Sequence, residues 1–399
     1  MRKRHRLFPL FAAFTLLLCF GCQKKETEVS ETEQTMAENA VVKGFIDVSM
    51  ISTFGNIYTD VAKQKFYDAG FELGDILTMR FMGQEVDAPF VTSYSDITSL
   101  STGIFALSDY EIITLAINMG DFASYYGIAE KINEGDWTTW KLKSDSGEPI
   151  EIEFSLKEKG GYLDQYMIMQ LEYSYERSDY PQLNDEEFAN FRNIATSGMG
   201  KNILYRSSST IDDEYKRAAY SDKAAEDHHI AYILNLTDNE SELNAFPGYE
   251  DTYFASVNHM ARNLNMDVTS EENRDCIAEF MRIIAGNKGP YLIQCLQGKD
   301  RTGYFCGILE ALMGASYDEI VEDYMVTFYN WYGVTKQDES YQIIADNNII
   351  NTLETVFETD DLKSTDLEGA AHKYLLDIGL SEKEIEDIKA NLSADYVDQ

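Results

Sequence analysis

Basic residues are scarce in this chain of 399 residues, which has 33 Lys and Arg against 69 Asp and Glu and a formal net charge of −36. Proteins that bind nucleic acids do so mainly through lysine and arginine contacts with phosphate, usually from a basic surface. A charge this negative excludes DNA or RNA binding as the main function, and we expect no nucleic-acid partner. It also opposes the approach of polyanions, so an anion site here must be a local positive region.

Cysteine is also scarce. The five cysteines are too few and too widely spaced for a disulfide framework. Cys276 and Cys306 lie in stretches of helical periodicity and are predicted to fill a core. No group of histidines and cysteines has metal-site spacing, because the adjacent pair His228-His229 does not share one helix face. We therefore expect no metal ion and no other cofactor.

Long apolar runs are confined to the N-terminus, where Leu7–Phe20 follows a basic start of Arg2, Lys3, Arg4 and Arg6. This run is too short for a comfortable membrane span and is typical of a secretion signal. It ends in Gly21-Cys22, which resembles a bacterial lipoprotein cleavage box. An ordinary signal peptide with a chance cysteine is the alternative. We expect residues 1–21 to be a signal peptide, and lipidated Cys22 to anchor an extracytoplasmic protein to its membrane.

The rest of the chain divides into three parts. Residues 22–42 are polar and charged and predict a flexible tether. About 375 residues remain after the signal, which is typical of two domains. We place the first domain at 43–155 and the second at 156–399.

The first predicted domain consists of short alternating runs separated by Gly and Asp. The runs are Val42–Ile46, Ile76–Phe81, Ile112–Ile117 and Ile150–Leu156. Alternation with a period of two residues predicts strands, and hence a small β-rich barrel or sandwich.

Two stretches of this domain, Phe54–Asp60 and Ala116–Ala123, resemble the C-terminal barrel of the S-adenosylmethionine hydroxide adenosyltransferases. The resemblance implies a ligand- or substrate-recognition module, since the catalytic half of that family has no counterpart here. The alternative is that Asn56, Asp60 and Asn118 only cap turns.

The most informative segment is Gln294–Gly303, which reads QCLQGKDRTG. A strand-like run, Gly289–Ile293, precedes it, and a helical run, Tyr304–Met313, follows it. A loop between a strand and a helix N-terminus directs its amide groups towards one point and adds the positive end of the helix dipole. Such a point suits a phosphate dianion, and it also lowers the pKa of a thiol. Lys299 adds a cation at its rim.

Each polar residue of this segment has a candidate role. Cys295 is the candidate nucleophile, and Arg301 can bind two phosphate oxygens with its planar fork. Thr302 can donate its hydroxyl to the departing sulfur. Asp300 can protonate the leaving oxygen and then activate water. The predicted phosphate-binding residues are Leu296, Gln297, Gly298, Lys299, Asp300 and Arg301.

The segment resembles the signature loop of the cysteine-dependent phosphatases. Its GKDRTG form is similar to that of the bacterial atypical tyrosine/lipid phosphatases. Leu204–Ser208 and Ile233–Asp238 resemble two further motifs of that group, so the resemblance covers roughly residues 180–395. It implies an α/β fold with a central sheet flanked by helices. It also implies hydrolysis of phosphomonoesters through a phosphocysteine intermediate, with a phosphotyrosine protein, a phospholipid or an inositol phosphate as substrate.

The sequence departs from the family pattern at three points. Gln294 stands where the family usually has His, which puts the rate in doubt, and Thr237 stands where an arginine is usual. No Trp-Pro-Asp acid loop is visible, which strengthens Asp300 as general acid and leaves Asp238 in reserve. The alternative function is a non-catalytic lipoprotein that binds phosphorylated ligands.

Overall fold

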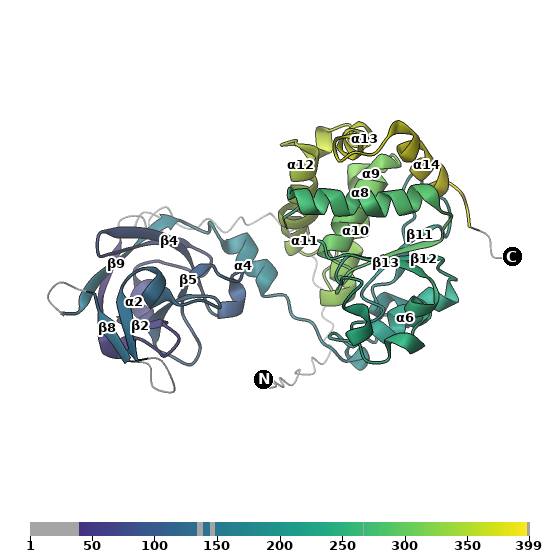
Figure 1. Cartoon of the computed structure of the whole chain (residues 1–399). Helices are drawn as coiled ribbons and strands as arrows, with labels where there is room; N and C mark the ends of the chain where they lie inside the picture. Colours follow the sequence, from purple (N-terminus) through teal and green to yellow (C-terminus); the bar gives the residue numbers. More distant parts are fainter. Residues whose placement is uncertain (1–39, 134–138, 144–147, 266, 397–399) are drawn as a thin grey trace, which may run out of the picture.

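The computed structural model describes residues 40–133, 139–143, 148–265 and 267–396, and Figure 1 shows a β-rich body followed by an α/β body. The predicted signal peptide, the lipidation site Cys22 and most of the tether lie outside these residues. Among the described helices, none combines the length and the apolarity needed to cross a bilayer.

The first body is built on one seven-stranded sheet, as the alternating pattern predicted. Its strand order is β1-β9-β3-β4-β5-β6-β2. The strands are β1 (Val41–Ile46), β2 (Ile57–Ala62), β3 (Ile76–Phe81), β4 (Gln84–Val91), β5 (Thr102–Phe105), β6 (Ile112–Ile117) and β9 (Ile150–Glu158). Two short helices, α2 (Lys63–Asp68) and α3 (Phe122–Tyr125), and a hairpin of β7 (Ala129–Asn133) and β8 (Thr139–Leu142) accompany it.

The two end strands of this sheet meet, which makes it barrel-like. The Phe45 amide of β1 donates to Asp60 Oδ1 of β2 at 2.7 Å. A Cβ on Gly44 would lie 2.2 Å from the Val61 side chain, so glycine is required at this contact. The interior holds a cluster of buried rings, including Phe66, Phe90 and Phe154.

The limits of the first body differ slightly from 43–155. Strand β1 begins at Val41, inside the predicted tether, because Val41 and Val42 are β-branched and pair with Ser155 and Phe154 of β9. At the other end, β9 continues to Glu158.

Helix α4 (Leu163–Met169) joins the two bodies. Tyr162 and Tyr166 pack on a small core cluster of the first body. Ile168 and Leu171 pack against the main core of the second. The connection is therefore a packed helix with an apolar contact on each side.

The second body has a five-stranded sheet in the order β10-β11-β14-β12-β13. Strands β11, β14, β12 and β13 are parallel, and β10 is antiparallel to β11. Their bounds are β10 (Arg192–Asn193), β11 (Leu204–Ser207), β12 (Tyr232–Asn235), β13 (Asn258–Ala261) and β14 (Tyr291–Gln294). Every residue of the central strand β14 is buried, as expected for a parallel strand covered on both faces.

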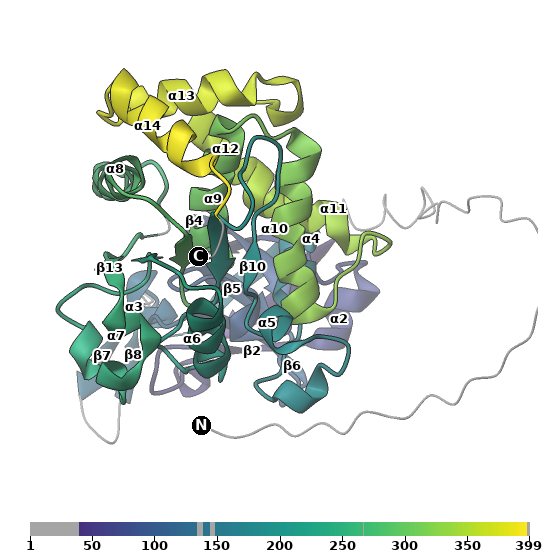
Figure 2. The ribbon, with the colours of Figure 1, turned by 90° about the vertical axis from the view of Figure 1, so that its right-hand side faces the viewer.

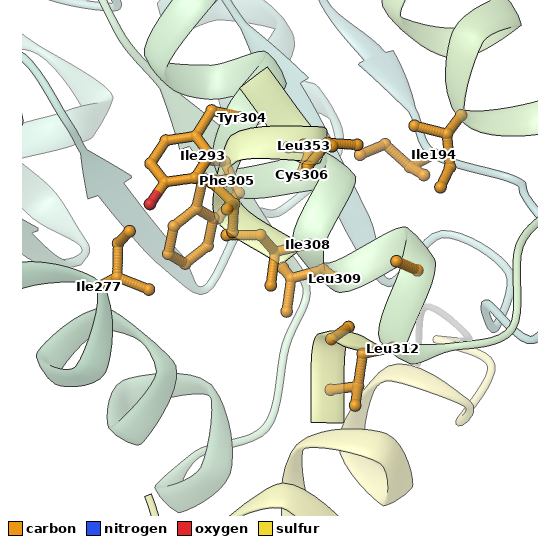
Figure 3. Packing of buried hydrophobic residues seen from close by; sticks show 14 of the residues in the cluster. Ile194, Ile277, Ile293, Tyr304, Phe305, Cys306, Ile308, Leu309, Leu312 and Leu353 are labelled. Carbon is orange, nitrogen blue, oxygen red and sulfur yellow. The ribbon is translucent and has the colours of Figure 1, made fainter. Parts of the chain in front are cut away.

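Helices cover both faces of this sheet, as Figure 2 shows with α8 above it and α6 and α7 below. Ile293 belongs to the core under α8 and α9, whereas Leu292 belongs to the opposite core, which α6 and α7 cover. Figure 3 shows Ile293 beside Phe305 and Ile277 in the larger core. Cys276 and Cys306 are buried free thiols, as predicted.

The helices of this body are α5 (Asp185–Phe188), α6 (Ala218–Asp227), α7 (Tyr253–Ser256), α8 (Glu271–Gly286), α9 (Asp300–Leu312), α10 (Tyr317–Tyr332), α11 (Ser340–Ala345), α12 (Asn351–Phe357), α13 (Leu367–Asp377) and α14 (Glu382–Leu392). A π-helical turn, η6 (Asp346–Ile350), joins α11 directly to α12.

Candidate active site

Cys295 directly follows the central strand of the second sheet. Strand β14 pairs with β11 on one side and β12 on the other, so Cys295 leaves the sheet at the carboxyl edge of parallel strands, where ligands of open α/β sheets bind. The residue is 3% exposed. Helix α9 begins at Asp300, four residues earlier than predicted, because an acidic residue is favourable in a first turn. We call Cys295–Arg301 the signature loop.

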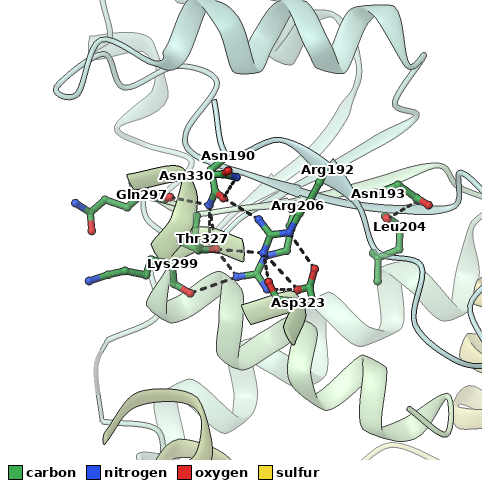
Figure 4. A network of polar contacts seen from close by, with 11 residues as sticks. Asn190, Arg192, Asn193, Leu204, Arg206, Gln297, Lys299, Asp323, Thr327 and Asn330 are labelled. Carbon is green, nitrogen blue, oxygen red and sulfur yellow. Dashed lines mark hydrogen bonds and ion pairs between the residues drawn. The ribbon is translucent and has the colours of Figure 1, made fainter. Parts of the chain in front are cut away.

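The carbonyl groups of Leu296 to Lys299, in the middle of the signature loop, are held by the surrounding fold. Three side chains bind them: Arg206, Asn190 and Trp331. Figure 4 shows much of this network. The bonds are Ser209 amide to Leu296 O (3.2 Å), Trp331 Nε1 to Gln297 O (3.1 Å), Asn190 Nδ2 to Gln297 O and Gly298 O (3.3 and 3.2 Å), and Arg206 Nη2 to Gly298 O and Lys299 O (3.1 and 3.5 Å).

The amide groups of the same residues are unused. None of them donates a hydrogen bond to another group in the described part of the chain. They are the amides of Leu296, Gln297, Gly298, Lys299, Asp300 and Arg301, the six residues predicted to bind phosphate. Since a peptide unit directs its N–H opposite to its C=O, tying the carbonyls outward turns the amides inward. A row of free amides at a helix N-terminus is an anion-binding concavity.

Gly298 makes this turn possible. Its φ is +67°, in the left-handed region, and a Cβ there would lie 2.2 Å from Ser207 O. Both facts require glycine, because the clash is with backbone and no side-chain rotation relieves it.

A buried ion network fixes the loop from behind. Arg206 is fully buried, and its Nη1 donates to Asp323 Oδ2 of α10 at 2.6 Å. Arg192 Nε donates to Asp323 Oδ1 at 2.9 Å. Burial alone would lower the pKa of Arg206 and raise the pKa of Asp323, but their mutual attraction outweighs burial, so each pKa shifts towards the charged form. Arg206 and Asp323 therefore stay ionised inside the core.

Gln294 contributes one hydrogen bond to this arrangement. Its side chain is fully buried, and its Oε1 accepts from the Thr210 amide at 3.2 Å. Its Nε2 has no partner in the part of the chain that the structure describes. Gln294 thus ties the signature loop to the segment after β11 but brings no charge near the thiol.

Arg301 is turned towards the ends of β12 and β13. Its Nη1 donates to Asn263 Oδ1 at 3.0 Å and to Leu236 O at 3.5 Å. Thr302 is fully buried, and its Oγ1 has no hydrogen-bond partner among the residues described. Its hydroxyl is therefore available to a neighbouring sulfur or ligand.

Lys299 and Asp300 lie at the rim. Lys299 Nζ is 3.6 Å from Asp300 Oδ2, and it lies 5.4 Å and 5.8 Å from the ring centres of Phe328 and Tyr332. Burial lowers the pKa of Lys299, but Asp300, Tyr332 and Cys295 together outweigh burial, so the pKa is raised. The side chain of Asp300 is 37% exposed and open to solvent.

Asp238, the reserve acid, is better shielded. It is 8% exposed, and its Oδ2 accepts from Asn235 Nδ2 at 2.9 Å. Burial raises the pKa of Asp238, and the carboxylates of Asp212 and Glu242 add to the rise, whereas Asn235 and Arg301 oppose it. A carboxyl group that keeps its proton to higher pH is suited to act as an acid.

A model of the tyrosine phosphatase family matches residues 178–394, which is more than half of the chain. The chain belongs to the tyrosine phosphatase family.

Individual relatives match a smaller part of the chain. A tyrosine-protein phosphatase from Nostoc commune is 27% identical over 135 residues, which cover 28% of this chain and 42% of the relative. The chain thus spans less than half the length of that relative.

Solved structures resemble the chain only weakly. One is the core catalytic domain of the PP-IP phosphatase SIW14 from S. cerevisiae, which is 18% identical. The aligned region covers 42% of this chain and 91% of the SIW14 chain, with a TM-score of 0.26. Another is a phosphatase from Neisseria meningitidis, described as putative, which is 15% identical. The aligned region covers 37% of this chain and 96% of the Neisseria chain, with a TM-score of 0.23.

Three residues of this tyrosine phosphatase site were not predicted as site residues. Asp323 and Asn190 are far from the loop in sequence and carry no local signal, and Arg206 lies in the Leu204–Ser208 motif without an assigned role.

In the described residues, no three His, Cys, Asp or Glu side chains are grouped so as to bind a metal ion.

Proposed function

We propose that this protein hydrolyses phosphomonoesters through a phosphocysteine intermediate. The observation that supports this most directly is the row of six free amides beside a buried cysteine, with the carbonyls of Leu296 to Lys299 tied outward. Such amides stabilise both a bound phosphate dianion and the charge of the transition state. Membership of the tyrosine phosphatase family agrees with the same chemistry.

The proposed reaction has two steps. Cys295 Sγ attacks phosphorus as a thiolate, the bond between phosphorus and the leaving oxygen breaks, and an acid donates a proton to that oxygen. Water then attacks the phosphocysteine, a base takes its proton, and the S–P bond breaks to release phosphate and the thiolate. Arg301 moves from Asn263 to two phosphate oxygens, and Thr302 donates its free hydroxyl to the departing sulfur.

The test is phosphate release from an aryl phosphate by the purified protein and by its Cys295→Ser variant. We expect the substitution to abolish turnover, because a serine hydroxyl stays protonated where the thiol ionises. Activity that survives this substitution would exclude the mechanism.

The second candidate is a phosphate-ligand-binding lipoprotein without turnover. Gln294 favours it, since a neutral amide with one satisfied end replaces the family histidine beside the nucleophile. This candidate predicts binding of phosphotyrosine or an inositol phosphate with no phosphate release. Detectable hydrolysis that depends on Cys295 excludes it.

We also propose that Cys22 is lipidated and anchors the protein outside the cytoplasm. The basic start, the apolar run and the Gly21-Cys22 pair support this proposal. Labelling with a radioactive fatty acid followed by membrane fractionation tests it. We expect a labelled membrane protein that loses its label in Cys22→Ala. An unlabelled protein in the soluble fraction would contradict the proposal.

For the first domain we propose ligand recognition. The stretches Phe54–Asp60 and Ala116–Ala123 meet at one open pocket of about 640 Å³. Asn56 and Asn118 also serve the fold, because their Nδ2 groups donate to Tyr94 Oη and Ile97 O. Calorimetry with adenosine and S-adenosylmethionine tests the implied ligand class, and no heat with either would exclude it.

A further inference from the structure

A second pocket, of about 160 Å³, opens beside the first turn of α9. Asp300 and Arg301 line it, so it lies beside the C-terminal end of the signature loop. Its far wall comes from the π-helical turn η6 and the start of α12, which provide Asn347, Asn348 and Thr352. π-helical turns interrupt the regular hydrogen-bond ladder and occur often at functional sites.

The two asparagines of η6 present acceptors to the pocket. Asn347 Nδ2 donates to Ile343 O at 2.9 Å, and Asn348 Nδ2 donates to Ile344 O at 2.7 Å. Both side-chain donors are thus used by the helix itself. Neither Oδ1 accepts a hydrogen bond from another described residue, so the free polar atoms of these amides are acceptors.

Tyr324 of α10 supplies a buried hydroxyl to the same pocket. The residue is 2% exposed, and its hydroxyl has no partner among the described residues. Leaving a buried polar group without a hydrogen-bond partner is unfavourable, so a partner from a ligand is favourable. The ring packs closely on α9 at Gly303, where a Cβ would be 2.5 Å from Tyr324 Cε2.

Charge is limited in this pocket. Apart from Asp300 and Arg301, its lining residues are uncharged. Arg301 is needed for the transferred phosphate, which leaves no cation for a second one. The pocket therefore offers hydrogen-bond acceptors but no additional positive charge.

We propose that this pocket binds the leaving group, and that it selects a neutral alcohol with several hydroxyl groups, singly phosphorylated. The hydroxyls donate to Asn347 Oδ1 and Asn348 Oδ1 and pair with the Tyr324 hydroxyl. The proposal rests on the proposed function of the signature loop. It makes Asn347, Asn348 and Tyr324 specificity-determining residues, with no role in the bond-breaking steps.

The test compares two six-carbon phosphates with the full-length protein in detergent. Sorbitol 6-phosphate has five hydroxyls, and hexyl phosphate has none. We expect kcat/KM to be at least about tenfold higher for sorbitol 6-phosphate, because a polar site disfavours an analogue that leaves its groups unpaired. Sorbitol 1,6-bisphosphate should react more slowly than the monophosphate.

Substitutions connect this preference to the pocket. Tyr324→Phe removes only a hydroxyl that the fold does not use, and it should lower the ratio of the two kcat/KM values several-fold. Asn348→Leu should do the same. Asn351→Ala is the matched control, because Asn351 is an exposed asparagine on α12 that does not line the pocket. It should leave the ratio unchanged.

A binding measurement tests the pocket independently of whether the protein hydrolyses its ligand. Calorimetry on the Cys295→Ser variant should show tighter binding of sorbitol 6-phosphate than of hexyl phosphate, whether or not the wild-type protein turns them over. Equal binding, or equal kcat/KM with Cys295-dependent hydrolysis, overturns the pocket assignment and leaves the phosphatase proposal intact. Selective binding without hydrolysis supports the pocket and contradicts the phosphatase.

Discussion

At the scale of residues, the site contains two carboxyl groups with different surroundings. Asp300 is partly exposed beside Lys299. Asp238 is nearly buried, and burial raises its pKa. Enzymes often assign acid and base roles to carboxyl groups that lie in different environments. The sequence placed Asp300 first because it lies inside the loop, whereas the shielding of Asp238 depends on distant segments and has no sequence signal.

The pH dependence of kcat/KM distinguishes the two acids. A general acid must be protonated, so the rate falls as pH rises through its pKa. If Asp300 is the acid, Asp300→Asn removes this alkaline limb and lowers kcat by about 100-fold, the lower range of acid–base contributions. Asp238→Asn should then keep the limb. Loss of the limb in Asp238→Asn alone would transfer the role to Asp238.

Two glycines, one in the signature loop and one in the first turn of α9, show how far prediction from single residues extended. A loop between a strand and a helix N-terminus predicted an anion site, and the free amides agree with it. The reasons for Gly298 and Gly303 became visible only in three dimensions. Gly298 approaches the backbone of Ser207, and Gly303 makes room for the ring of Tyr324, a residue 21 positions away in a different helix.

At the scale of elements, the strand β14, the signature loop and helix α9 were predictable because their signals are local. Alternation, turn residues and a helix start lie within a few positions of each other. The support that helix α10 gives to the loop has no such local signal. The buried Asp323 of this helix reaches Arg206 and thereby the loop carbonyls, a contact over 117 positions. The local sequence pattern does not predict a contact between residues so far apart in the chain.

Asp323→Asn tests the support that α10 gives to the loop. Removing one partner of a buried ion pair costs about 3–5 kcal/mol, so the free energy of unfolding at pH 7 should fall by that amount. Because the pKa of Asp323 is lowered in the folded protein, its stabilisation exists above the ordinary pKa and is lost as pH falls through the lowered value. The difference from wild type should therefore shrink in acid.

Glu322→Gln is the control for this measurement. Glu322 is its exposed neighbour on α10, and its ion pair among the described residues is with exposed Lys336, a surface interaction that contributes little to stability. Urea unfolding of both variants at pH 7 and pH 3 gives the comparison. A loss as small for Asp323→Asn as for Glu322→Gln would contradict a supporting role for the network.

At the scale of the whole molecule, an anion site lies within a strongly acidic chain. The net charge of −36 repels a phosphorylated substrate at long range, while the loop amides attract it only at contact. The two bodies were predictable from their composition and periodicity. The packed helix α4 between them was not, since its two apolar contacts are with residues distant in sequence.

We therefore expect added salt to strengthen the apparent binding of a phosphorylated substrate. The Debye length falls from about 30 Å at 0.01 M to about 10 Å at 0.1 M, so salt screens the repulsion more than the contacts in the loop. We expect KM for an aryl phosphate to decrease as sodium chloride rises from 10 to about 150 mM, with kcat little changed. An increase in KM over this range would show that local positive charge dominates the approach.

The central claim is a covalent phosphocysteine at Cys295, and acid quenching tests it most directly. The protein is mixed with an aryl phosphate, stopped in acid during turnover, digested and analysed by mass spectrometry. We predict that the peptide containing Cys295 gains the mass of one phosphoryl group, and that the Cys295→Ser variant shows no such gain and releases no phosphate. Phosphate release by the wild type with Cys295 unmodified, continuing in Cys295→Ser, would contradict the account.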